Sequence, residues 1–90
     1  MRQAPTALVR HGFRYHFYSV DRKEPPHVHV WHGGHRAKFW LLPNIVLDKK
    51  KKCTLTRSEL SKARKILRAE KEDVLQEWAK FFSRAVPEDA

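Results

Sequence analysis

The 90-residue sequence contains a single cysteine, Cys53, and no long apolar run. One cysteine excludes an intramolecular disulfide and a zinc site built from cysteines, and it fits a reducing compartment. We therefore expect a cytoplasmic protein. Cys53 has no base at a readable spacing and is expected to be inert. Neither a signal peptide nor an apolar stretch long enough to cross a bilayer is recognisable, so no membrane association is expected.

Acidic residues are scarce compared with basic ones. Nineteen Lys and Arg against ten Asp and Glu leave a net charge of +9 and a pI near 10.1. Such an excess in a small domain favours a polyanionic partner, namely RNA, DNA or an acidic protein. The length predicts one domain over residues 1–90, with a core over roughly 13–82 and frayed termini. Because so small a domain buries a modest share of its surface, a homo-oligomer is a further alternative.

The hydrophobic pattern changes its period near residue 56. Before that point, alternation and aromatic enrichment predict strands over 13–20, 27–32 and 35–42, and shorter ones over 45–47 and 53–55. Thr56 and Glu59 then have the spacing of a capping box that opens a helical pattern, weakest over Arg68–Asp73. The sequence thus predicts an α+β domain. A small, mainly antiparallel β-sheet of three to five strands is packed on one face by a C-terminal helix or helix pair.

Turn chemistry fixes how these strands should pair. Gly33-Gly34 has the composition of a two-residue hairpin turn, which places His29 opposite Lys38. Symmetric closure of the loop over 21–26 would place Tyr18 opposite His29. One face of the sheet is then apolar and should lie under the helix. The other face gathers basic and aromatic side chains, which are Arg14, His16, Tyr18, His27, His29, Trp31, Arg36, Lys38 and Trp40.

This second face is the candidate functional surface. Aromatic rings that stack on bases, mixed with cations that bind phosphates, are typical of proteins that recognise single-stranded RNA on a sheet. The run Lys49, Lys50, Lys51 and Lys52 extends the same track, or is simply a solvated loop. The predicted nucleic-acid-binding residues are Arg14, His16, Trp31, Arg36, Trp40, Lys49, Lys50, Lys51 and Lys52. Exposed Trp31 and Trp40 would equally suit a protein interface.

His27 and His29 allow three interpretations. As an acid–base pair, with Tyr18 positioning a nucleotide and Arg14, Arg36 or Lys38 stabilising charge on phosphorus, they would cleave RNA without a metal or other cofactor. As a His-x-His pair on a strand, they supply two ligands for a divalent metal such as zinc, with no evident third ligand. In the structural alternative, His27 caps the loop through the backbone and His29 stacks on Tyr18 or Lys38.

Three further residues are expected to structure the loop before His27. Pro25 and Pro26 fix their φ angles and force the preceding residues into extended conformations, so the chain enters the strand already stiff. Asp21 opens the loop and is expected to accept backbone hydrogen bonds within it.

The pattern D-x-x-x-P-P-H-x-H-V resembles that of a family of small bacterial proteins, domain of unknown function 4160. It is carried here by Asp21, Pro25, Pro26, His27, His29 and Val30, followed by Gly33 and by Trp78 in a terminal helix. The resemblance covers roughly Phe13 to Phe82. It implies the toxin-like half of a type II toxin–antitoxin pair, with a small antitoxin-like partner protein and an RNA target. No settled reaction comes with the resemblance, so a non-catalytic module that binds nucleic acid or protein, and a small metal-binding protein, remain alternatives.

Overall fold

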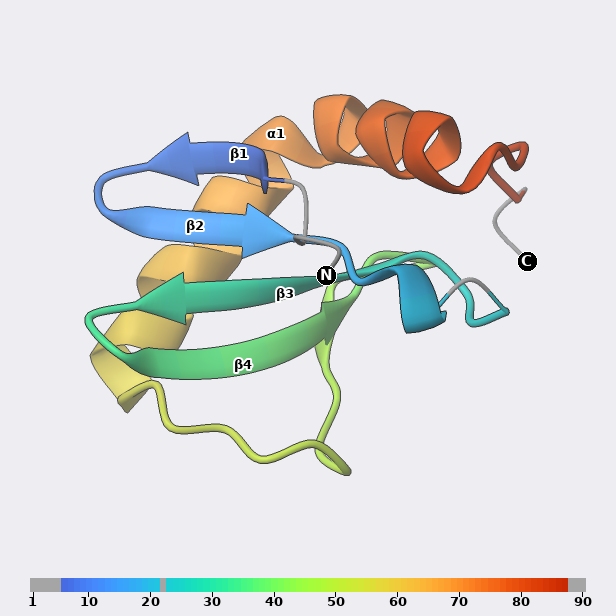
Figure 1. The fold of residues 1–90 in the computed structure, drawn as a ribbon. Helices are drawn as coiled ribbons and strands as arrows, with labels where there is room; N and C mark the ends of the chain where they lie inside the picture. Colours follow the sequence, from blue (N-terminus) through green and yellow to red (C-terminus); the bar gives the residue numbers. More distant parts are fainter. Residues whose placement is uncertain (1–5, 22, 88–90) are drawn as a thin grey trace.

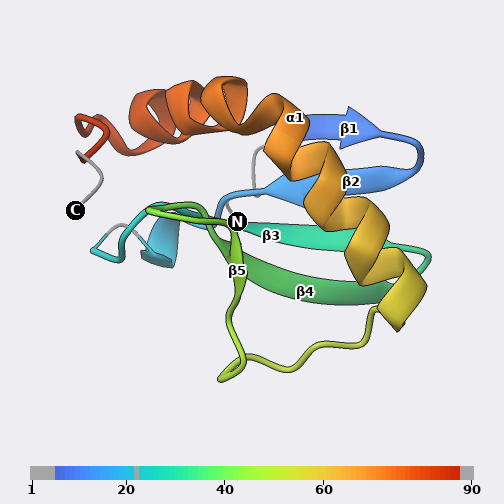
Figure 2. The ribbon, with the colours of Figure 1, turned by 180° about the vertical axis from the view of Figure 1, so that it is seen from behind.

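The structure is a computed structural model that describes residues 6–21 and 23–87, without the side chain of Asp21. Its elements, in chain order, are β1 (Thr6–Arg10), β2 (Phe13–His16), a 3-10 helix (Ser19–Asp21), β3 (His27–His32), β4 (His35–Trp40), β5 (Val46–Leu47) and α1 (Arg57–Phe82). The strands form one five-stranded antiparallel sheet in the order β1-β2-β3-β4-β5. The α1 helix lies against one face of it (Figure 1 and Figure 2). The predicted α+β architecture is confirmed.

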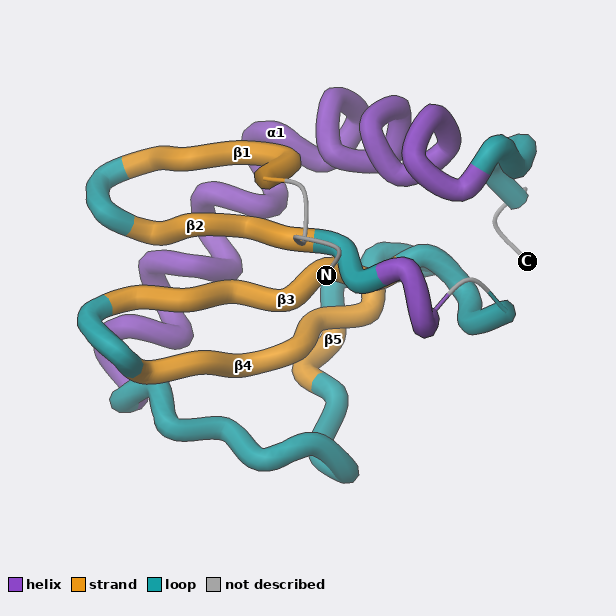
Figure 3. The backbone as a smooth tube through the Cα atoms, in the orientation of Figure 1, coloured by secondary structure: helices purple, strands orange, loops and turns teal. Residues whose placement is uncertain are grey.

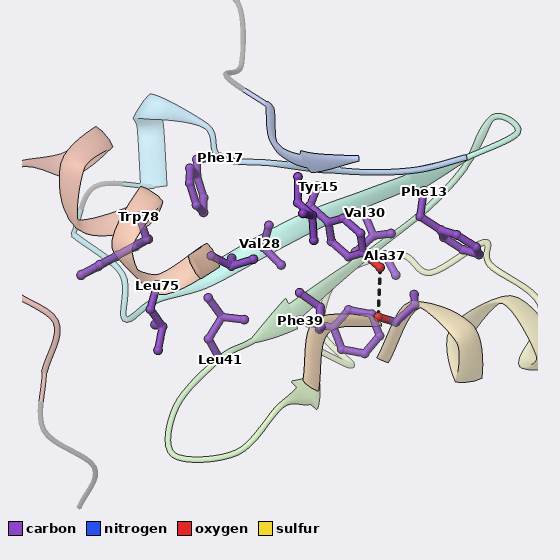
Figure 4. Close-up of a cluster of buried hydrophobic side chains, with 14 of the residues drawn as sticks. Phe13, Tyr15, Phe17, Val28, Val30, Ala37, Phe39, Leu41, Leu75 and Trp78 are labelled. Atoms are coloured by element: carbon purple, nitrogen blue, oxygen red, sulfur yellow. Dashed lines mark hydrogen bonds between the residues drawn. The ribbon is translucent and has the colours of Figure 1, made fainter. Parts of the chain in front are cut away.

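The core fills the space between the sheet and α1. Alternate residues of β2, β3 and β4 face the helix, as the period of two predicts. The core receives Phe13, Tyr15, Val28, Val30, Ala37 and Phe39 from these strands, and Phe17 and Leu41 from the residues directly after β2 and β4. From α1, the core receives Ala63, Leu67, Val74, Leu75, Trp78 and Phe82. Tyr15 is fully buried and donates its hydroxyl hydrogen bond to the carbonyl of Ala63 at 3.0 Å (Figure 4).

The α1 helix begins and ends with well-formed caps. The Thr56 side chain accepts from the backbone N–H of Glu59, and the Glu59 carboxylate accepts from that of Thr56, so the predicted capping box is present. Ser83 ends the helix in the left-handed conformation, at φ 52°. The helix is continuous through Arg68–Asp73, where the sequence left a break open, and it changes direction near its middle (Figure 3). That bend lets its second half cover the end of the core around Phe17.

The hairpin of β3 and β4 has the predicted register. His29 pairs with Lys38, Val28 with Phe39 and His27 with Trp40. The two turn glycines have φ of 55° and 83°, a region that L side chains rarely adopt, so the turn depends on glycine at both positions.

The register predicted between β2 and β3 was wrong. His29 pairs with His16, not with Tyr18, because β2 stops at His16. The chain then makes the 3-10 turn Ser19–Asp21 before it reaches the prolines. The shift is an even number of residues, so the predicted sorting of side chains between the two faces survives it.

Two edge segments also differ from expectation. Thr6–Arg10 forms β1 through a turn at His11-Gly12, both with positive φ, whereas the sequence suggested frayed chain before residue 13. The segment over 53–55 is not a strand. Thr54 nevertheless binds the β4 edge, since its N–H donates to the carbonyl of Arg36 and its hydroxyl accepts from the N–H of Arg36, both at 2.8 Å.

Candidate nucleic-acid interface

The sheet face opposite α1 contains a pocket of about 340 Å³. Its walls come from β3, β4, the chain after β2 and the lysine-rich segment after β5, which runs along the outer side of β4 (Figure 3). The lining residues are Tyr18, Val20, His29, Trp31, Arg36, Ala37, Lys38, Lys51 and Lys52. Seven of the residues predicted for this face or for the lysine run, Tyr18 among them, therefore meet in one cavity.

The aromatic side of the pocket is held together by internal contacts. The Trp31 indole N–H donates to the Tyr18 hydroxyl at 3.0 Å, and the Tyr18 and His29 rings lie 4.4 Å apart between centroids. The Arg36 guanidinium lies over the Trp31 ring, 5.4 Å from its centroid. All three rings are partly exposed. Because Tyr18 accepts from Trp31, its own O–H remains able to donate to a ligand.

The opposite side of the pocket is cationic, and Asp48 orders it. The backbone N–H of Lys50 donates to the Asp48 carboxylate at 3.0 Å, and that of Lys51 donates to the Asp48 carbonyl at 3.2 Å. These bonds form a turn that leaves all four lysines of the run, Lys49 to Lys52, exposed. Lys51 and Lys52 line the pocket, while Lys49 and Lys50 lie outside its lining.

His27 lies beneath this face. It is 1% exposed, and its Nδ1–H donates to the carbonyl of Pro25 at 2.9 Å. Its ring stands edge-to-face to His29 and to Trp40, with centroids 5.2 and 5.4 Å apart. This is the geometry of the structural alternative, in which His27 closes the loop and His29 contacts Tyr18. A buried imidazole already bonded to the backbone does not reach a ligand in the pocket.

Lys38 is also buried, although it lines the pocket. Only 3% of its side chain is exposed, and its Nζ lies 2.6 Å from Glu24 Oε1 and 3.4 Å from Asp48 Oδ2. The same ammonium lies 4.3 Å from the centroid of Trp40. The charge of Lys38 is therefore directed at protein carboxylates and not at the cavity.

The remaining predicted residues lie around the pocket. Arg14 is exposed and pairs across the sheet with Trp31, while His16 Nδ1 lies 3.4 Å from the Thr6 hydroxyl. Trp40 is half-buried between Lys38 and His27. None of Arg14, His16 and Trp40 is among the lining residues.

The carbonyls of both loop prolines accept hydrogen bonds. Pro26 is fully buried, and its carbonyl accepts from the N–H of Leu41 at 3.0 Å, while the carbonyl of Pro25 accepts from His27. The expected hydrogen bonds of the Asp21 side chain lie outside the described residues.

Sequence reasoning missed the acidic residues that organise the site. Glu24 and Asp48 both contact Lys38, and Arg84 donates from Nη1 to the Glu24 carbonyl at 2.9 Å. The predicted hairpin register gave one indication of such a contact. It placed Lys38 opposite His29 and next to Trp40 on the same face, and a lysine packed among rings needs a carboxylate partner.

Over residues 6–21 and 23–87, no group of three or more His, Cys, Asp or Glu side chains is placed to hold a metal ion. In the same part of the chain, no helix has the length and apolarity needed to cross a membrane.

Comparison with known proteins gives one match. The sequence profile of a family described as Domain of unknown function (DUF4160) matches residues 12–79. A search of curated proteins and a search of solved structures each found no match. The matched range runs from the turn before β2 to the end of the Trp78 turn of α1, and it includes the Pro-Pro-His-x-His segment and every residue of the pocket lining. The chain therefore belongs to the DUF4160 family.

Proposed function

We propose that this protein binds single-stranded RNA in the pocket of the uncovered sheet face. The observation that carries the proposal is the meeting of rings and cations in one cavity. Tyr18, His29 and Trp31 lie on one side with Arg36 over the Trp31 ring, and Lys51 and Lys52 complete the lining. A net charge of +9 attracts the RNA backbone towards the domain as a whole.

Each side of the pocket suits a different part of a nucleotide. Rings of partly exposed aromatic residues offer faces on which a base can stack, largely irrespective of its identity. The neighbouring cations reach the phosphates on either side of that base. Bases of a duplex are already stacked and paired, so a recessed pocket of this kind selects unpaired RNA.

In the cell, we propose the role of a toxin-like protein of a type II toxin–antitoxin pair acting on cytoplasmic RNA. A small antitoxin-like partner would neutralise it by covering the same pocket. If RNA is cleaved, we propose that His29 and the Tyr18 hydroxyl exchange the protons, because both line the cavity whereas His27 is enclosed. Binding alone would also block RNA, so the proposal does not depend on cleavage.

The test is titration of a labelled single-stranded RNA and of its duplex, followed by fluorescence anisotropy at several salt concentrations. We expect the wild type to prefer the single strand, with a log–log salt slope of about −2 for three phosphate-binding cations. Trp31→Ala should weaken binding about ten-fold or more with the slope unchanged, since it removes stacking. Lys51→Ala should reduce the slope by about 0.7. Lys80→Ala is the matched control, because Lys80 is exposed on α1 and forms an ion pair with Glu77, away from the pocket lining.

Absence of binding by the wild type, or equal binding by Trp31→Ala and Lys80→Ala, would overturn the proposal. Gel analysis of the same RNA after incubation decides whether it is cleaved. Growth of a bacterial host after induced expression tests the toxin role. Arrest by the wild type and growth with an equally abundant His29→Ala variant is the expected result, and growth with both would remove the toxin role.

A further inference from the structure

The buried ammonium of Lys38 joins two segments that are far apart in the sequence. Glu24 belongs to the connection between β2 and β3, and Asp48 follows β5 directly. Both carboxylates reach the same nitrogen, at 2.6 and 3.4 Å. The backbone reinforces the second contact, because the N–H of Asp48 donates to the carbonyl of Lys38 at 2.8 Å.

Each carboxylate is tied to one wall of the pocket. On one side, Glu24 lies in the same β2–β3 connection as Val20, a lining residue with 87% exposure. On the other side, Asp48 accepts the N–H groups of Lys50 and Lys51 and so orders the turn that presents the lining lysines. The separation of the two walls is thus spanned by a single side chain, that of Lys38.

We propose that Lys38 is a positioning residue that holds the two walls of the pocket at the spacing that admits one unpaired nucleotide. This inference rests on the proposed RNA binding and deepens it, since it assigns the selection of single strands to a named brace of Lys38, Glu24 and Asp48. Within the brace, two carboxylates face one ammonium. Lys38 therefore has no unshared charge for a phosphate, and the phosphate-binding cations are Arg36, Lys51 and Lys52.

Three variants distinguish a positioning role of Lys38 from direct binding of phosphate. Lys38→Met keeps the unbranched apolar stem of the side chain and removes the ammonium, which leaves two carboxylates close together. The triple variant Lys38→Met, Glu24→Gln, Asp48→Asn removes all three charges and relieves that repulsion, so it keeps the proposal testable if the single variant does not fold. Lys38→Arg retains the cation and both partners, and it should restore most of the wild-type behaviour. Lys80→Met is the matched control on the exposed surface.

The first readout is hydrogen exchange of the protein without RNA. The amides of Lys50 and Lys51, which bond to Asp48, and that of Leu41, which bonds to the Pro26 carbonyl, report on the two walls. We expect faster exchange at these amides in Lys38→Met and in the triple variant, while the amides of the α1 core stay protected. Wild-type exchange at both walls in the triple variant would overturn the brace, whether or not the protein binds RNA.

The second readout is RNA binding with its salt dependence. A positioning role predicts that the triple variant binds single-stranded RNA about ten-fold more weakly, loses part of its preference over duplex, and keeps the wild-type salt slope. A slope reduced by about 0.7 would instead make Lys38 a direct phosphate ligand and overturn the inference. If the wild type binds no RNA, the proposed function fails, and the exchange measurement alone then decides whether the brace exists.

Discussion

Replacing His27 by alanine should chiefly lower the free energy of unfolding of the domain. We do not expect it to remove a group that reacts with RNA. The imidazole is 1% exposed, donates to the Pro25 carbonyl at 2.9 Å, and packs edge-to-face against His29 and Trp40. Alanine would leave a cavity under the polar face and a loop carbonyl without its donor.

The size of the effect follows from these contacts. Truncation of this buried ring to alanine should cost about 2–3 kcal/mol of packing free energy. This is less than for Phe or Trp, because imidazole is a smaller ring. The lost hydrogen bond adds about 1 kcal/mol. A domain of this length has roughly 5–13 kcal/mol of stability in total, so the variant should lose a large share of it. The corresponding fall in Tm is about 12–25 °C.

Thermal and urea unfolding followed by circular dichroism measure this loss, with His29→Ala as the comparison. His29 is half-buried, so its variant should remain within about 1 kcal/mol of the wild type while RNA binding weakens. His27→Asn, whose amide can donate to the same carbonyl, should recover about 1 kcal/mol relative to alanine. A His27→Ala protein with wild-type Tm that no longer acts on RNA would refute this reasoning and return His27 to a chemical role.

Two further predictions concern the core and the carboxylates. Tyr15→Phe removes the hydrogen bond to the Ala63 carbonyl without leaving a cavity, so it should reduce the free energy of unfolding by about 1 kcal/mol, and an unchanged urea midpoint would contradict it. Burial raises the pKa of the Asp48 carboxyl, but the hydrogen bond from the Lys50 N–H and the Lys38 ammonium outweigh burial, so this pKa is lowered overall. The pKa of Glu59 is also lowered, first by the hydrogen bond from the Thr56 N–H and then by His35. A lowered pKa stabilises the fold fully above the unfolded value, about 4, and this stabilisation is lost as the pH falls through the folded pKa. Tm should therefore decline on acidification below that value, and Asp48→Asn and Glu59→Gln should each flatten the decline.

The elements whose structure is decided by residues close in the sequence could be predicted from the sequence. Gly33-Gly34 fixed the register of its hairpin, because only a two-residue turn fits that composition, and Thr56 with Glu59 marked the first turn of α1. The separation of the two sheet faces followed from the alternation of side chains, and the pocket formed on the predicted face.

The failures occurred where longer-range contacts decide the structure. The register of β2 depends on the 3-10 turn Ser19–Asp21, for which the apparent alternation through Tyr18 and Val20 gave no sign. β1 is an edge strand with a single strand neighbour, so its pattern is weak and its position is set by pairing with β2. Lys38 counted as an exposed cation in the pattern, but the fold brings Glu24 and Asp48 to it from other parts of the chain.

The order of the elements also decides when the apolar face of the sheet becomes covered. Every strand pairs with its neighbour in the chain, so the sheet can assemble as a meander before α1 is made. At about 5–20 residues per second, the ribosome needs about 1–5 s to add the 26 residues of α1. During that interval Phe13, Phe17 and Phe39 face solvent on a sheet that has nothing to pack against. The nascent chain is then at its most aggregation-prone, and chaperones that bind apolar strands should engage it at this stage and leave when the helix docks.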